Sequence, residues 1–125
     1  MPDKETTGAI NARLNYVELP AEDFAGSKTF FETAFGWSLT SFGPDYAATM
    51  GQGTDLGLNG DLPEAVKAPL AVIEVDDLET ALASVIAAGG EVVRPIFAFP
   101  GGRRFHFREP SGSELAVYIN EPEPN

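Results

Sequence analysis

The sequence predicts an α+β fold of two βαβββ modules that form a curved mixed sheet around a cleft, with the helices outside. Three observations predict it. Segments 17–37 and 71–91 each run from an apolar strand through an acidic turn to an amphipathic helix and a glycine. Asp23 and Asp77, offset by 54 residues (77 minus 23), precede the two helices. Three short strand-like segments follow each helix, so a paired repeat is expected to bury one sheet face and leave a cleft on the other.

The predicted boundaries make one domain of two modules. At 125 residues and 43% hydrophobic content, the chain can form one domain of ordinary size with its own core. The domain is expected at residues 10–120, with module one at 12–60 and module two at 68–120. Residues 1–9 and 121–125 are expected to be flexible termini.

Module one begins with a strand at residues 14–20, where apolar and polar side chains alternate as in a half-buried strand. Asp23 offers an N-cap oxygen to a helix that reaches about residue 35, and Gly36 is expected to end it in a left-handed conformation. Apolar residues at three- and four-residue spacing predict the helix face that packs on the sheet. They are Phe24, Ser27, Phe30, Phe31, Ala34 and Phe35. The three strands that follow are expected at residues 38–42, 46–50 and 54–58.

Module two repeats this order. After a strand at residues 71–75, Asp77 is expected to cap a helix that Gly89 and Gly90 end. The equivalent apolar stripe consists of Leu78, Ala81, Leu82, Val85 and Ile86. The last three strands are expected at residues 92–97, 103–108 and 114–119.

Strand parity divides the side chains between two faces. The helix-facing set is apolar: Val17, Leu19, Ala71, Ile73, Val75, Phe105, Phe107, Leu115, Val117 and Ile119. The opposite set is mixed: Tyr16, Glu18, Leu70, Val72, Glu74, Arg104, His106, Arg108, Glu114, Ala116 and Tyr118. Because this second set is too polar for a core and too aromatic for simple solvent exposure, we expect it to line a ligand cleft.

Composition excludes several classes of function. The formal charge of −11, with 8 Lys and Arg against 19 Asp and Glu, argues against nucleic acid as a partner. No apolar run approaches the roughly 20 residues that span a bilayer, and residues 1–7 do not look like a signal peptide, so a cytoplasmic protein without a membrane partner is expected. Zero cysteines exclude disulfides, thiolate metal sites and cysteine nucleophiles.

Five motifs in a fixed order resemble those of one superfamily. They are Val17-Glu18-Leu19-Pro20 with Asp23, Phe30-Phe31 with Phe35-Gly36-Trp37, residues 73–78, Ala88-Gly89-Gly90, and Glu109-Pro110-Ser111-Gly112. The chain resembles the glyoxalase/bleomycin-resistance/ring-cleaving dioxygenase superfamily, also called vicinal oxygen chelate proteins, and above all its small members described as related to lactoylglutathione lyase. The resemblance covers residues 14–120 and implies a homodimer.

The resemblance also implies where a divalent metal, which the family commonly uses, would be held. The ligand positions fall on Tyr16, Leu70 and Ala116 and, least directly, on Gly57. Leu, Ala and Gly side chains cannot ligate a metal, and Tyr is a rare ligand for the ions concerned, so neither a metal site nor another cofactor is predicted. The alternative is a shifted site, which would draw on Glu18, Glu74, His106 and Glu114.

Two functions follow from the resemblance and the missing ligands. The first is a small-molecule-binding protein whose cleft is lined by Tyr16, Leu70, Val72, His106, Ala116 and Tyr118. The alternative is a lyase, isomerase or dioxygenase that uses a displaced metal or an acid–base pair of His106 with a glutamate. The candidate catalytic residues are His106, Glu114 and Glu18. Because Glu18, Glu74 and Glu114 would ring the cleft with negative charge, the ligand is expected to be neutral or cationic and partly apolar.

Overall fold

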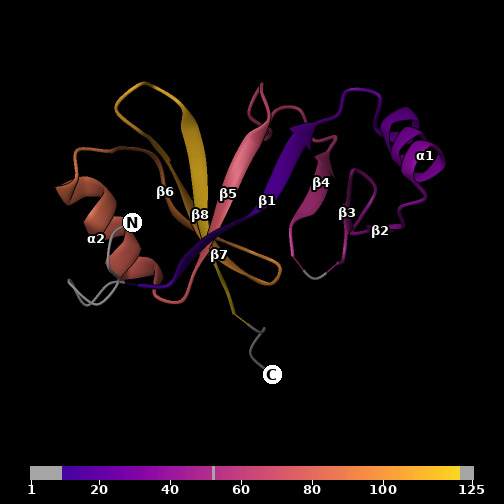
Figure 1. The fold of residues 1–125 in the computed structure, drawn as a ribbon. Coiled ribbons are helices and arrows are strands. Elements are labelled where there is room, and N and C mark those ends of the chain that lie inside the picture. Colours follow the sequence, from indigo (N-terminus) through magenta and orange to yellow (C-terminus); the bar gives the residue numbers. More distant parts are fainter. Residues whose placement is uncertain (1–9, 52, 122–125) are drawn as a thin grey trace. The chain divides into compact units, whose positions relative to one another are not determined.

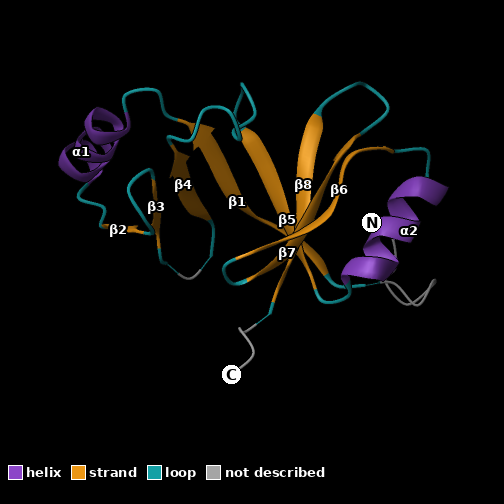
Figure 2. Cartoon of the chain, turned by 180° about the vertical axis from the view of Figure 1, so that it is seen from behind, coloured by secondary structure: helices purple, strands orange, loops and turns teal. Residues whose placement is uncertain are grey.

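The computed structural model describes residues 10–51 and 53–121 (Figure 1). The chain divides into two compact units, Asn15–Ala71 and the described residues before and after that segment. Each unit contains one βαβββ module, so the predicted α+β fold of two such modules is confirmed (Figure 2). Of the expected flexible termini, residues 1–9 and 122–125 lie outside the described residues. Glu121 accepts hydrogen bonds from Arg103 Nε and Nη2 at 2.8 and 2.9 Å.

Module one is a four-stranded sheet with one helix. Its elements are β1 (Ala12–Pro20), α1 (Phe24–Phe35), β2 (Leu39–Ser41), β3 (Tyr46–Thr49) and β4 (Asp55–Asn59). The strand order is β2-β3-β4-β1, in which β1 runs parallel to β4 and the other neighbours are antiparallel. The chain therefore returns from α1 to the far edge of the sheet and works back towards β1.

Helix α1 begins and ends where the sequence predicts. The Asp23 side chain accepts a hydrogen bond from Gly26 N at 3.0 Å, and Gly36 ends the helix at φ 71°. Phe24 and Phe31, which lie on one side of the helix, pack on a core of four buried residues. This core consists of Ala21, Leu39, Ala47 and Leu58.

The prediction that the whole apolar stripe of α1 packs on the sheet is wrong for three residues, Phe30, Ala34 and Phe35, which are exposed. Phe30 and Phe35 are 57% and 58% exposed, and α1 contains no fully buried residue. A straight helix contacts a sheet along a narrow line, so residues at the flanks of a broad stripe stay outside. The rings of Phe30 and Phe35 pack on each other, and Phe35 also packs on Trp37.

Module two has longer strands. Its elements are β5 (Leu70–Val75), α2 (Leu78–Ala87), β6 (Glu91–Phe99), β7 (Gly102–Arg108) and β8 (Glu114–Asn120), in the sheet order β5-β8-β7-β6. Strands β6, β7 and β8 form an antiparallel meander. Its core consists of Val75, Leu78, Ala81, Phe105 and Val117, with Ile73, Phe107 and Ile119 packed against it, as strand parity predicts.

Helix α2 is capped more firmly than α1. Asp77 accepts from both the backbone N of Thr80 at 3.1 Å and its hydroxyl at 2.8 Å. Hydrogen bonds to the charged form therefore lower the pKa of the Asp77 carboxyl. The helix ends at Ala87, and Gly89 takes the left-handed conformation at φ 99°. Neither helix is long and apolar enough to cross a membrane, a finding that covers the described residues alone.

Candidate functional site

Glu18 is the centre of a polar network on the strands of module one. Its side chain is only 2% exposed. Tyr46 Oη donates to Glu18 Oε1 at 3.0 Å, and Asn59 Nδ2 donates to Glu18 Oε2 at 3.2 Å. Tyr16 Oη lies 2.5 Å from Tyr46 Oη, which extends the network by one hydroxyl. Burial, followed by the charge of Glu18 and by Tyr16, raises the pKa of Tyr46 far above its ordinary value, so its hydroxyl stays protonated.

Gly57 makes room for the two tyrosines. It is buried in β4 directly opposite Glu18 in the strand register. A Cβ at this position would overlap the hydroxyl of Tyr16 and lie 2.5 Å from that of Tyr46. Glycine is therefore required at position 57 because the Tyr16 and Tyr46 side chains approach its backbone closely, and not because of its backbone conformation.

His106 is the corresponding centre in module two. It lies in β7 between Arg94 of β6 and Ala116 of β8, and it is 1% exposed. Its Nδ1 is 2.9 Å from Glu114 Oε2. Its Nε2 is buried and has no hydrogen-bond partner in residues 10–51 and 53–121.

The electrostatic environment lowers the pKa of His106 and so favours the neutral ring. Burial lowers the pKa of His106, the Glu114 hydrogen bond opposes this, and the charges of Arg104 and Arg94 add to the lowering. A neutral ring that donates from Nδ1 to a carboxylate carries its lone pair on Nε2. The structure thus presents a buried hydrogen-bond acceptor whose orientation is fixed by Glu114.

Two guanidinium groups and an aromatic ring lie next to His106. The centroid of Phe97 is 5.9 Å from that of His106, with Arg94 Cζ at 4.0 Å and Arg104 Cζ at 5.3 Å from the Phe97 ring. Sequence reasoning placed Arg104 on this face but missed Arg94 and Phe97. Strand β6 is mostly apolar without alternation and has register shifts between Val92 and Arg94 and between Arg94 and Phe97, so parity could not assign its faces.

The three carboxylates expected to ring the cleft each have a partner. Glu18 binds Tyr46 and Asn59, Glu114 binds His106, and Glu74 forms an exposed ion pair with Arg13 at 3.3 Å. The face of module two therefore combines Glu114 with two cationic groups and is less negative than the sequence suggests.

The residues predicted to line the ligand site fall into two groups, each within its own unit. Tyr16 belongs to the Glu18 network, whereas Ala116 faces His106 across the β7–β8 pair. Tyr118 is half-buried beside Phe99, with ring centroids 6.4 Å apart. Leu70, Val72 and Ala116 are at most 2% exposed. Their role as ligand contacts stays a prediction.

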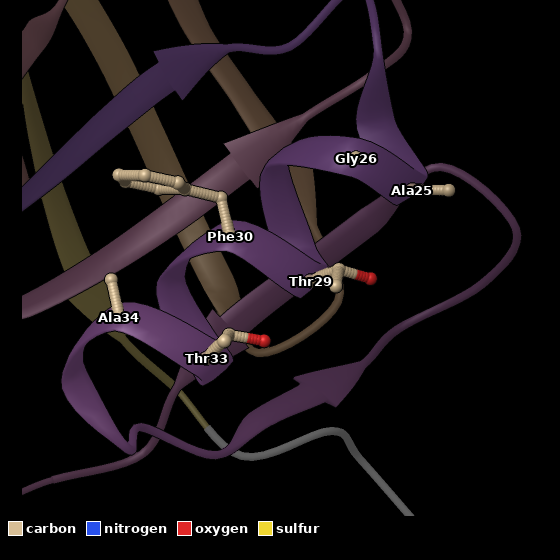
Figure 3. A pocket seen from close by; sticks show the side chains of 6 residues that line it. All are labelled: Ala25, Gly26, Thr29, Phe30, Thr33 and Ala34. Carbon is tan, nitrogen blue, oxygen red and sulfur yellow. The ribbon is translucent and has the colours of Figure 1, made fainter.

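Two hollows open elsewhere, both within the unit of residues 15–71. The first, of about 640 Å³, lies along α1 and is lined by Ala25, Gly26, Thr29, Phe30, Thr33 and Ala34 (Figure 3). Figure 3 shows that the polar side-chain groups of its lining are the hydroxyls of Thr29 and Thr33. The lining residues carry no charged or metal-binding side chain. The second, of about 620 Å³, lies beyond the end of α1, between Trp37 and Met50.

The four positions where the resemblance implies a divalent metal do not fit one. Leu70, Ala116 and Gly57 offer no donor atom, and the Tyr16 hydroxyl fills the space beside Gly57. Within the described part of the chain, no group of three or more His, Cys, Asp or Glu side chains is arranged to hold a metal ion.

Comparisons with known proteins place the chain in one family. Residues 13–117 match the model of the Glyoxalase/Bleomycin resistance protein/Dioxygenase superfamily. No curated protein matches the sequence significantly.

Solved structures share the fold at low sequence identity. A member of this superfamily from Vibrio splendidus 12B01 is 17% identical, with a TM-score of 0.67 over 90% of this chain and 100% of that one. Methylmalonyl-CoA epimerase from Mycobacterium tuberculosis is 15% identical, with a TM-score of 0.70 and coverage of 89% and 88%. The Mn(II)-bound glyoxalase from Novosphingobium aromaticivorans is 21% identical, with a TM-score of 0.64, and the match covers 92% of this chain and 43% of that one.

Proposed function

Because the chain belongs to the glyoxalase/bleomycin resistance protein/dioxygenase superfamily, we propose that it binds a small organic molecule on the strand face of module two, around His106. One observation carries this proposal. His106 Nε2 is buried without a partner among the described residues, while Nδ1 is held by Glu114. Buried polar atoms are nearly always hydrogen-bonded, so an acceptor of this kind is best explained by a ligand that donates to it.

The surroundings of His106 define the ligand class. A donor group, such as a hydroxyl, meets Nε2, and an aromatic or apolar body packs on Phe97 and Tyr118. Arg94 and Arg104, whose guanidinium groups lie within 5.3 Å of the Phe97 ring, favour a carboxylate or carbonyl oxygen. This reverses the charge preference expected from the sequence. Val72, in the same unit, remains a predicted contact, and the ligand contacts predicted for Tyr16 and Leu70 concern the other unit.

A matched pair of probes tests this site. 4-Hydroxyphenylacetate carries a hydroxyl donor and a carboxylate, whereas tyramine has a similar aromatic body with an ammonium group. Calorimetry should show that 4-hydroxyphenylacetate, which carries the carboxylate, binds more strongly than tyramine. The substitution His106→Gln should weaken it about tenfold, which corresponds to about 1.4 kcal/mol.

The site also offers a matched control. Arg104→Gln should weaken carboxylate binding, while Arg108→Gln, which removes an exposed charge of the same strand away from Phe97, should change it less than about twofold. Equal effects of the two substitutions, or equal binding of the two probes, would contradict the assignment.

We further propose that the protein works without the metal common in its family, because the implied ligand positions carry no fitting donors. Elemental analysis of freshly purified protein should give far less than one Zn, Ni, Mn or Fe per chain. Glyoxalase activity on the glutathione hemithioacetal should be absent. About one such metal per chain, lost together with stability on chelation, would refute this and point to Glu18, Glu74, His106 and Glu114 as a displaced site.

One observation favours an enzyme as the second candidate. The His106–Glu114 pair has the geometry of a base held by a carboxylate, and nearby guanidinium groups can stabilise negative charge that develops when a proton leaves a carbon next to a carbonyl. In this role His106 accepts the proton and Glu114 positions its ring. Exchange of such a proton for deuterium by the wild type but not by His106→Gln would establish this catalytic role. Binding of a ligand without proton exchange would support small-molecule binding as the function.

Two further properties are proposed from the family resemblance alone. The protein is expected to be a homodimer and to reside in the cytoplasm. Sedimentation that finds only a 13.3 kDa species at micromolar concentration would contradict the first.

A further inference from the structure

The sheet of module one is left partly uncovered at the end of α1. The helix ends at Gly36, and Trp37 and Ser38, which follow it, line an opening together with residues of β1 and β4. The result is the hollow of about 620 Å³, a volume typical of sites for small organic molecules. Val17 and Leu56, which are opposite each other in the β1–β4 register, both line it. By parity they lie on the other side of the sheet from Tyr16 and Glu18.

Trp37 forms a rigid aromatic wall of this hollow. Its ring stacks on Phe31 with an interplanar angle of 4° and a centroid distance of 5.6 Å, and it also packs on Phe35. Yet 42% of Trp37 and 66% of Met50, another lining residue, are exposed to solvent. Large apolar side chains that gather in the open around a concavity are typical of a binding surface.

Among the residues that the structure describes, Asp55 is the single charged one that lines the hollow. Its Oδ1 is fixed by hydrogen bonds from the Thr49 hydroxyl and from Gly51 N, both at 2.7 Å. Its Oδ2 accepts no hydrogen bond from the residues that the structure describes. A carboxylate that is held in place by one oxygen can present the other to a ligand. The formal charge of −11 adds a general attraction for cations.

We propose that this hollow is a second ligand site, which takes a small organic ammonium ion with an aromatic or aliphatic body. The ammonium group pairs with Asp55 Oδ2, and the body packs on Trp37, Met50 and the Val17–Leu56 floor. Because Trp37 is only partly covered by Phe31 and Phe35, its indole can add a cation–π attraction. The site differs from the one around His106 in its module and in the sign of its charge.

The single tryptophan of the chain makes a direct measurement possible, because its side chain lines this hollow. Phenethylammonium and 3-phenylpropionate are matched probes with the same aromatic body and opposite charge. Phenethylammonium should change the Trp37 emission in a saturable manner, and 3-phenylpropionate should bind at least tenfold more weakly. No saturable change, or equal binding of the two probes, would overturn the proposal.

Variants separate this site from a nonspecific charge effect and from the site around His106. Asp55→Asn, which keeps an oxygen for Thr49 and Gly51, should weaken phenethylammonium binding about five- to tenfold. The control Glu22→Gln removes an exposed charge of the same module outside the hollow and should change it less than twofold. His106→Gln should leave the Trp37 response unchanged even where it abolishes binding of 4-hydroxyphenylacetate.

A second variant decides the outcome if Asp55→Asn impairs folding. Met50→Lys places a cation at an exposed rim position and should reduce phenethylammonium binding more than tenfold without loss of stability. Wild-type affinity in both Asp55→Asn and Met50→Lys would show that the emission change arises elsewhere, and the proposal would be rejected.

Discussion

The two modules share one order of elements but treat their buried polar groups differently. In module one, Glu18 accepts from Tyr46 and Asn59, and Tyr16 closes the network from the other side. In module two, His106 has one nitrogen bound by Glu114 and the other without a partner among the described residues. A network that satisfies itself stabilises the fold, whereas one with an open position can bind a ligand. The same scaffold thus carries one polar network that satisfies itself and one polar group with an open hydrogen-bond position.

The two modules do not differ in this way if removal of Glu18 and removal of Glu114 have the same effect on stability. Glu18→Ala leaves two buried donors, the Tyr46 hydroxyl and the Asn59 amide, without their acceptor, so the free energy of unfolding should fall by about 2–4 kcal/mol. Glu114 is 24% exposed and holds one ring nitrogen, so Glu114→Ala should cost about 1 kcal/mol. Urea unfolding of both variants, with the exposed Glu22→Ala as a control, measures the difference. Equal losses would mean that the module-two pair is as structural as the module-one network.

A substitution at Gly57 sharpens the comparison, because it tests how tightly the module-one network is packed. Gly57→Ala should destabilise the protein by about 1–3 kcal/mol, since the added Cβ overlaps the tyrosine hydroxyls. Tyr16→Phe removes one of these hydroxyls, so the double variant should be less destabilised than the sum of the single variants. Strict additivity in thermal or urea unfolding would contradict the close approach.

The smallest expected effect is the pH dependence that His106 gives to module two. Because its pKa is lowered in the folded protein, the unfolded chain binds the proton more readily. The contribution of His106 is therefore fully present above the ordinary histidine pKa of about 6.5 and is lost as the pH falls through the lower folded value. Wild type should lose stability on acidification in this range more steeply than His106→Gln. Arg94 and Arg104 add to the lowering of this pKa by burial, and Glu114 opposes it, so parallel curves would show that Glu114 offsets the other effects.

Local features of the fold were predictable from the sequence. Asp23, Asp77 and Gly36 act through neighbours within a few residues, so their capping roles follow from chain order. Strand parity likewise placed Phe105 and Val117 in the core, because alternation is a property of the strand itself. The exposure of Phe30 was not predictable from periodicity, since it depends on how much of the helix the sheet contacts.

The candidate site was predictable only in part, for a related reason. His106 and Glu114 occupy neighbouring strands with a simple register, and the sequence named both. Arg94 and Phe97 lie in a strand with two register shifts, which remove the regular alternation that parity requires. Tyr46 joins Glu18 through β3, a strand of four residues, which is too short to show a pattern. The pairing of Tyr16 with Tyr46 depends on the missing side chain of Gly57, which composition does not reveal.

The close packing at Gly57 constrains how this chain can change over evolution. An acidic residue introduced there would meet the hydroxyls of Tyr16 and Tyr46, so it requires at least one smaller residue in their place at the same time. Conversely, replacement of one tyrosine alone removes a hydroxyl from the Glu18 network while position 57 still carries no new side chain. Each single step passes through a less stable intermediate. The three positions are therefore expected to be epistatically coupled, because a donor side chain at position 57 fits only beside a smaller residue at position 16 or 46.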